Sequence, residues 1–164
     1  MNKYTFRCVA AGILVGIFLK FFIIDIVHVS GTSMLPTIKN GETLIVNKLS
    51  YGLDMPFGSS LITQWKEPEV DDIVVFMKDN NMVVKRVSAV AGTKLEYSTI
   101  SGYNLIINTK RIALTAEQYY RMKNSTVVPE NTVFVTGDNQ EVSIDSRSYG
   151  FVQTRNILGK VFFK

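Results

Sequence analysis

The feature that most constrains this chain is an apolar stretch near its N-terminus. Residues 8–19 are all apolar or glycine, Lys20 interrupts the run, and residues 21–27 resume it with only Asp25 as an exception. Together the two runs supply about 20 apolar residues, which is enough for a helix to cross a bilayer. We expect Lys20 to extend towards the lipid head groups, near Asp25.

The basic residues before this stretch set its expected orientation. Lys3 and Arg7 precede the apolar run, and positively charged flanks favour the cytoplasmic side of a membrane. Residues 1–29 are therefore expected to form a cytoplasmic N-terminus and a single-pass anchor in the cell membrane. Residues 30–164 are expected to form one extracytoplasmic domain.

A cleavable signal peptide is the competing interpretation, because it also begins with basic residues and a short apolar run. No small-x-small cleavage motif follows here, since the run continues into the bulky residues 21–24. Arg7 directly before Cys8 also disfavours acylation of the lipoprotein type. A retained anchor is thus the favoured interpretation.

Beyond Ser30 the sequence alternates short β-branched and aromatic runs with turn residues, a pattern typical of strands. Only residues 115–123 look helical, with Thr115 as a candidate N-cap. We therefore expect a mainly β fold, an antiparallel β-sheet domain with one N-terminal transmembrane helix. The expected strands are residues 43–46, 73–76, 82–90, 105–107, 132–136 and 157–163.

Composition excludes several function classes. The chain has 18 Lys and Arg against 14 Asp and Glu, and the basic residues are scattered. This predicts weak attraction to membrane lipid and no nucleic-acid binding. With one cysteine, inside the apolar run, and one histidine, neither a disulfide, a metal site nor a cofactor is expected.

The segment directly after the anchor holds a candidate nucleophile. Residues 30–37 read SGTSMLPT, in which Pro36 fixes its own φ and biases Leu35 towards an extended conformation. Ser33 would therefore be presented rigidly, close to the bilayer. Taken alone, a serine in such a loop is more often a turn former than a nucleophile.

Three further segments follow, and with residues 30–37 they resemble, in order and content, the type I signal peptidases. The resemblance implies a membrane-bound serine endopeptidase with a β-sheet catalytic domain that removes signal peptides from exported preproteins. The secretion machinery is a candidate partner. Residues 96–130 fall outside the matching segments and are expected to be a variable insertion. The matching segments are GETLIVNK at 41–48, DIVVF at 72–76 continuing to KRVSAVAG at 85–92, and GDNQEVSIDSR at 137–147, ending at Gly150.

The resemblance also implies roles for single residues. It assigns a nucleophile and a general base, a serine that hydrogen-bonds and orients the base, and two bracing ion pairs. Each pair could equally be a surface pair that contributes little. Gly31 stands where some members carry a hydroxyl for the oxyanion, so the second oxyanion donor is left open, and Gln140 stands where arginine is frequent. The residues are Ser33 (nucleophile), Lys85 (base), Ser143 (orienting), Asp145 with Arg147, and Asp138 with Arg86.

The residues themselves support a lysine base. Lysine can accept a proton only when it is neutral, which burial promotes. In a strand Lys85 shares a face with Val83 and Val87 while Arg86 points away. The one histidine, His28, lies at the membrane exit, where a solvated side chain is the simpler interpretation than a member of a Ser-His-Asp triad.

Two apolar sets complete the expected site. Signal peptides present small residues at the first and third positions before the cut, so shallow apolar pockets are expected to select them. The expected pocket walls are Met34, Leu35, Ile73, Val75 and Val84. A second cluster, expected either at the membrane interface or in the core, consists of Tyr51, Met55, Phe57, Leu61, Ile62 and Trp65.

Two rival functions come from other classes. A catalytically silent anchored relative would bind secreted chains without cutting them, but intact Ser33, Lys85 and Ser143 argue against it. A self-cleaving repressor also uses Ser/Lys chemistry on a β-rich fold. Such a regulator would need DNA-binding helices, where this chain has a membrane segment.

Overall fold

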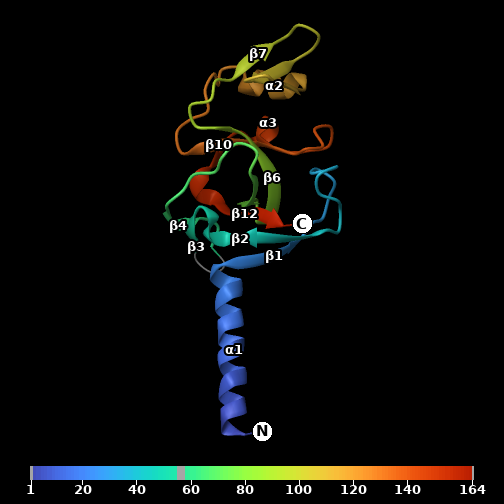
Figure 1. Ribbon diagram of the computed structural model, residues 1–164. Coiled ribbons are helices and arrows are strands. Elements are labelled where there is room, and N and C mark those ends of the chain that lie inside the picture. The colour runs from blue at the N-terminus through green and yellow to red at the C-terminus, as the bar shows by residue number, and fades with distance from the viewer. Residues whose placement is uncertain (1, 55–57, 164) are drawn as a thin grey trace.

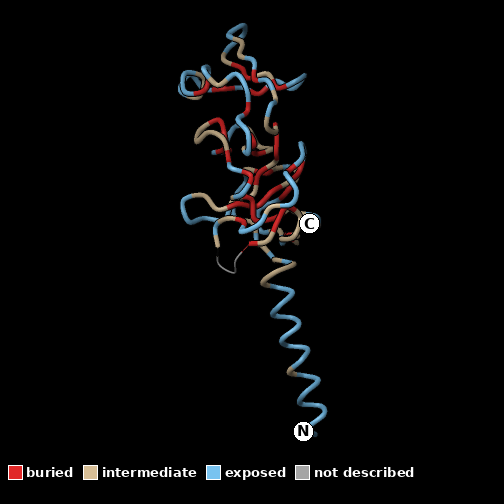
Figure 2. The backbone as a smooth tube through the Cα atoms, turned by 90° about the vertical axis from the view of Figure 1, so that its left-hand side faces the viewer, coloured by how far each residue is buried: buried red, intermediate tan, exposed pale blue. Residues whose placement is uncertain are grey.

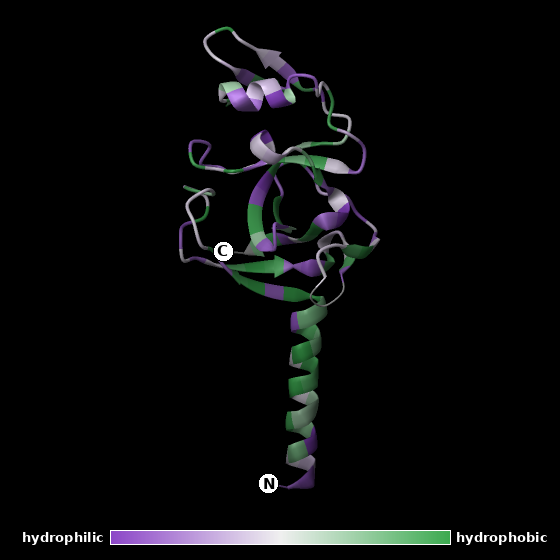
Figure 3. Ribbon diagram, turned by 180° about the vertical axis from the view of Figure 1, so that it is seen from behind, coloured by the Kyte–Doolittle hydropathy of each residue, from purple (hydrophilic) through white to green (hydrophobic). Residues whose placement is uncertain are grey.

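The protein consists of a projecting N-terminal helix and a β domain in the computed structural model, which describes residues 2–54 and 58–163. Helix α1 spans Lys3–Phe22 and stands away from the β domain (Figure 1). None of its residues is buried (Figure 2), and its surface is predominantly hydrophobic (Figure 3). Among the described residues it is the one helix long and apolar enough to cross a membrane.

The expected extension of the membrane segment to residue 27 is wrong. Helix α1 ends at Phe22, and strand β1, Ile24–His28, follows at once. Side chains alternate in this strand, with Asp25 and Val27 half-buried between exposed neighbours. A period of two in branched residues fits a strand that is covered on one side. Lys20 donates to Asp25 at 2.8 Å, as expected.

The β domain is built on one seven-stranded sheet in which every pairing is antiparallel. Its order is β1-β2-β12-β5-β6-β10-β11, and its core packs large side chains such as Phe76, Val87 and Ile157. The mainly β prediction is confirmed, because each expected strand of this sheet lies within its observed bounds. Those bounds are Thr43–Asn47 (β2), Ile73–Lys78 (β5), Asn81–Val90 (β6), Thr132–Thr136 (β10), Val152–Gln153 (β11) and Ile157–Phe163 (β12).

The residues expected to be an insertion form a small subdomain at the end remote from α1 (Figure 1). It contains strands β7 (Glu96–Ser98), β8 (Asn104–Ile107) and β9 (Lys110–Ala113) with helix α2 (Ala116–Met122). Thr115 caps α2 in a reciprocal capping box with Gln118, as the sequence predicts. The buried residues that hold it to the main sheet include Leu105, Ile112, Met122 and Phe134.

A hairpin of β3 (Gly52–Asp54) and β4 (Leu61–Gln64) lies near the base of the domain (Figure 1). Its apolar cluster divides between the two expected environments. Tyr51 and Leu61 are buried in the core, whereas Ile62 and Trp65 are 62% and 56% exposed. Met55 and Phe57 lie outside the described residues. Short helical turns complete the fold at Lys48–Ser50 (η1), Ser146–Tyr149 (α3) and Thr154–Asn156 (η2).

Candidate active site

A serine and a lysine from distant parts of the chain meet beside the main sheet. Lys85 Nζ lies 2.7 Å from Ser33 Oγ, within hydrogen-bond distance. Lys85 sits in the middle of β6, opposite Val74 of β5, and is only 4% exposed. Ser33 belongs to the loop between β1 and β2. Three strands separate β1 from β6 in the sheet order. The loop after β1 nevertheless reaches β6, where Ser33 contacts Lys85.

Burial shapes the electrostatics of Lys85. Removal of the ammonium from water lowers the pKa of Lys85 below its ordinary value. The Asp145 and Asp138 carboxylates oppose this shift, and the Arg147 guanidinium adds to it. Burial therefore shifts Lys85 towards the neutral amine relative to a solvated lysine, and the neutral amine is the form that can accept a proton from a hydroxyl.

The loop after β10 clamps the serine loop in place. The backbone N–H of Asn139 donates to the Ser33 carbonyl at 3.0 Å, and its side-chain amide donates to the Thr32 carbonyl at 3.2 Å. Gly137 packs so closely that a Cβ there would stand 2.4 Å from the Ser33 carbonyl oxygen. Sequence reasoning missed both positioning roles, because it placed Gly137 and Asn139 in a matching segment without giving either residue a role.

The expected pair of Asp145 and Arg147 is buried and made by two contacts. Arg147 Nε and Nη2 donate to the Asp145 carboxylate at 2.8 and 2.9 Å, and the two side chains are 4% and 0% exposed. Asp145 also accepts from the Gly137 N–H at 3.0 Å, and Arg147 donates to the Gln140 carbonyl at 2.9 Å. The pair therefore ties the loop that carries Ser143 to the end of β10, and it is not a surface pair.

The second expected pair joins β6 to the same loop. Arg86 donates to both oxygens of Asp138, at 2.8 and 2.7 Å. Burial alone would raise the pKa of Asp138, but the hydrogen bonds from Arg86 and Thr37 hold it below its ordinary value. Arg86 thus points away from the face that Lys85 occupies, as strand alternation predicts.

Ser143 lies in the site without the hydrogen bond that the resemblance implies. Its hydroxyl is buried and has no hydrogen-bond partner among the described residues. Its Oγ stands against Gly137, and the Gly137 position also touches the Ser33 carbonyl. His28 is exposed on β1, whereas the buried Lys85 side chain is the one that contacts Ser33 Oγ. Within residues 2–54 and 58–163, no cluster of His, Cys, Asp or Glu could hold a metal ion.

Hollows open on two sides of the Ser33–Lys85 pair. One, of about 170 Å³, is lined by the expected walls Met34 and Val84. The other, of about 580 Å³, is more open, with Lys78 and Tyr149 in its wall.

The remaining expected walls lie in different places. Val75 lines a separate cavity nearer α1. Ile73 packs against the buried cluster of Met34, Ile38 and Leu44. Leu35 is half-buried in the serine loop. Substrate contact by these three residues stays a prediction.

Comparison with known proteins gives one family. The family model described as "Signal peptidase, peptidase S26" matches residues 1–164. Signal peptidase I of Bacillus caldolyticus is 32% identical, over 89% of this chain and 81% of its own. Signal peptidase IB of Staphylococcus aureus is 33% identical, over 87% and 78%. A solved signal peptidase I from Enterococcus faecalis is 28% identical with a TM-score of 0.43, covering 59% of this chain and 98% of that structure.

Proposed function

The chain belongs to the signal peptidase family, peptidase S26, and on that premise we propose that it removes signal peptides with Ser33 as nucleophile and Lys85 as general base. The observation that carries the proposal is the 2.7 Å contact between Ser33 Oγ and Lys85 Nζ. It is supported by the burial that lowers the pKa of Lys85, because a neutral amine can activate a hydroxyl.

The reaction is an acyl transfer in two stages. Ser33 Oγ attacks the scissile carbonyl carbon while its proton passes to Lys85 Nζ. The carbon–nitrogen bond then breaks, and Lys85 returns the proton to the amine of the departing mature protein. Water, deprotonated by Lys85, attacks the ester and releases the signal peptide with a free carboxylate, which restores Ser33.

The bracing residues hold this geometry. The Asp145–Arg147 pair fixes the loop that presents Gly137 and Asn139 to the serine segment. The Asp138–Arg86 pair fixes the same loop to β6. Both pairs act through position, because effective proton transfer needs Oγ and Nζ to remain within hydrogen-bond reach.

The membrane arrangement is part of the proposal. Helix α1 has 20 residues, and at about 1.5 Å per residue this length matches a bilayer core of about 30 Å. Lys3 and Arg7 would remain in the cytoplasm, and the β domain, which begins with β1 at Ile24, would lie outside it. Lipid would then contact α1, whose residues are unburied. Partnership with the secretion machinery stays a prediction.

Cleavage of a presecretory protein by the purified full chain in detergent tests the proposal, with the cut site determined by N-terminal sequencing. Ser33→Ala should abolish cleavage because it removes the attacking hydroxyl. Lys85→Arg should abolish it as well, because a guanidinium stays protonated and cannot act as a base. Lys94→Arg, at an exposed lysine just before the distal subdomain, is the matched control and should keep full activity. Cleavage by folded Lys85→Arg at the parent rate would refute the assignment of the base.

A further inference from the structure

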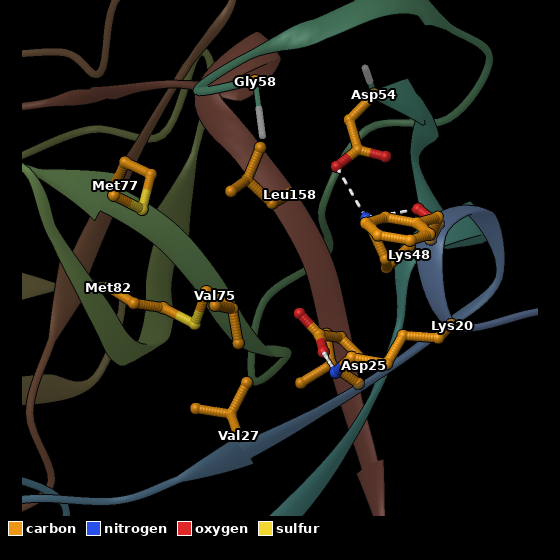
Figure 4. Close-up of a pocket in the computed structure, with 12 residues that line it drawn as sticks. Lys20, Asp25, Val27, Lys48, Asp54, Gly58, Val75, Met77, Met82 and Leu158 are labelled. Carbon is orange, nitrogen blue, oxygen red and sulfur yellow. Dashed lines mark hydrogen bonds and ion pairs between the residues drawn. The ribbon is translucent and has the colours of Figure 1, made fainter. Parts of the chain in front are cut away.

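A cavity of about 450 Å³ lies between α1 and the catalytic cleft. Figure 4 shows its two contrasting sides. Apolar side chains gather on one side, among them Val27, Val75, Met77, Met82 and Leu158. On the other side stand two ion pairs, Lys20–Asp25 at 2.8 Å and Lys48–Asp54 at 3.1 Å.

The cavity is the unfilled part of a trough formed by the curved main sheet. Val27 of β1 and Met82 of β6 line the same cavity, although β2, β12 and β5 lie between these strands in the sheet order. Near Ser33 the trough is filled by the buried cluster of Met34, Ile38 and Leu44. No comparable cluster of described residues fills it towards α1.

This cavity adjoins the hollow beside Ser33. Val27 and Met82 line both of them, while Lys20 and Phe21 in the last turn of α1 line the far end. A chain that reaches Ser33 from the side of α1 through the 170 Å³ hollow would therefore pass beside the cavity.

The order of a signal peptide gives the direction of that path. Its apolar segment precedes the small residues at the cut, so the residues before the cut approach from the side of α1. On this path the mature part would lie towards the open hollow with Lys78 and Tyr149 in its wall. An extended peptide directs alternate side chains to one face. If the first and third residues before the cut face the trough, the fifth does so too.

We propose that the cavity is a leader subsite, which takes an apolar side chain at the fifth position before the cut. The proposal rests on the proposed function, because it needs a signal peptide bound at Ser33. Its apolar side of Val75, Met77 and Leu158 suits a leucine-sized side chain and disfavours a polar one, whose hydrogen bonds with water would be lost. The enzyme would thus recognise the small residues near the cut together with an apolar residue at the fifth position before it.

Paired peptides test the subsite with the full chain in detergent micelles. The two peptides share one cut site and differ only in Leu or Ser at the fifth position before it. The parent should cleave the Leu peptide with a kcat/KM about tenfold higher, since a few methylenes in an apolar pocket discriminate on that scale.

Two variants at Met77, which lines the cavity but not the hollow beside Ser33, change its size in opposite directions. Met77→Trp should fill it and remove the preference for Leu, so that the ratio of kcat/KM for the Leu and Ser peptides falls to about one. Met77→Ala should enlarge it and shift the preference towards a Phe peptide. Ile100→Trp, at a 78% exposed position in the distal subdomain, is the control and should change neither ratio.

Each other outcome overturns the subsite. Equal cleavage of the Leu and Ser peptides by the parent would refute the leader subsite and leave the proposed function intact. Cleavage of neither peptide would refute both the subsite and the proposed function. If Met77→Trp slowed both peptides equally, and the loss varied with the acyl-chain length of added phosphatidylglycerol, the occupant would be a lipid tail. Should Met77→Trp fail to fold, the change of preference in Met77→Ala alone decides between these outcomes.

Discussion

The close approach of Gly137 to the nucleophile loop gives a sharp prediction for Gly137→Ala. A Cβ built at this position would stand 2.2 Å from Ser143 Oγ and 2.4 Å from the Ser33 carbonyl oxygen. The Ser143 hydroxyl can rotate away, but Ser143 Cβ, at 2.6 Å, cannot, and the Ser33 carbonyl belongs to the backbone and accepts a hydrogen bond from Asn139. The added methyl group must therefore push apart the backbone at Ser33, the proposed nucleophile, and the loop that carries Ser143.

The size of the displacement sets the expected loss. An ordinary contact begins near 3.4 Å, so a contact of 2.4 Å requires the Ser33 carbonyl to move by about 1 Å. A misplacement of about 1 Å can cost roughly 100-fold in rate, which corresponds to about 2.7 kcal/mol in the activation barrier. We expect kcat to fall by about that factor, with a smaller effect on KM.

Two matched glycine variants separate this effect from a general loss of stability. Gly16→Ala, in α1 with open space around it, should leave kcat and Tm unchanged. Gly52→Ala would place a Cβ 2.2 Å from the Thr63 carbonyl in the β3–β4 hairpin, so it should lower Tm while the folded enzyme keeps its kcat. Steady-state cleavage of a presecretory peptide and thermal unfolding are measured for all three. A Gly137→Ala enzyme with kcat within threefold of the parent would refute the reasoning.

Three further predictions concern the same site. Burial lowers the pKa of Lys85, and the proposed mechanism uses Lys85 as the neutral amine, so kcat/KM should rise tenfold per pH unit below that pKa and level off above it. A flat pH profile from pH 5 to 10, with the fold intact by circular dichroism, would contradict this. Asp145→Asn leaves the buried Arg147 without its charge partner and should lower the free energy of unfolding, measured by urea denaturation, by about 3–5 kcal/mol. A loss below 1 kcal/mol would show that the pair is dispensable for stability. Gly31 has φ of +123°, which side chains rarely adopt, so Gly31→Ser should lower kcat/KM through backbone strain; an unchanged or raised value would instead favour a gain of an oxyanion donor.

Much of the β domain could be predicted because its strands carry strong local signals. The strand from Thr132 to Thr136 and the cap at Thr115 were found from their own residues, and both are as expected. The end of α1 could not be found in this way. An apolar run suits a membrane helix and a half-buried strand equally, and only the pairing of β1 with β2 decides that residues 24–28 are a strand.

The ion pairs show a different limit. Asp145 and Arg147 are two positions apart, a spacing that sequence alone cannot distinguish from a solvated pair. Asp145 instead caps the short helix α3 with its carboxylate, which accepts from the Arg147 N–H at 3.2 Å. That local geometry turns both side chains inward. Gly137 was missed for the opposite reason, because its constraint comes from a loop about one hundred residues away in the chain.

The arrangement of charges around Lys85 has a physical logic that no single segment contains. A lysine base needs a lowered pKa, yet the loop that positions the serine carries two carboxylates, Asp145 and Asp138, whose fields raise the pKa of Lys85. Each carboxylate is held by an arginine, Arg147 or Arg86. Arginine keeps its charge under all ordinary conditions, and the Arg147 guanidinium itself lowers the pKa of Lys85. The pairs can therefore brace the loop without forcing the base into its protonated form, so that burial remains the dominant influence on Lys85.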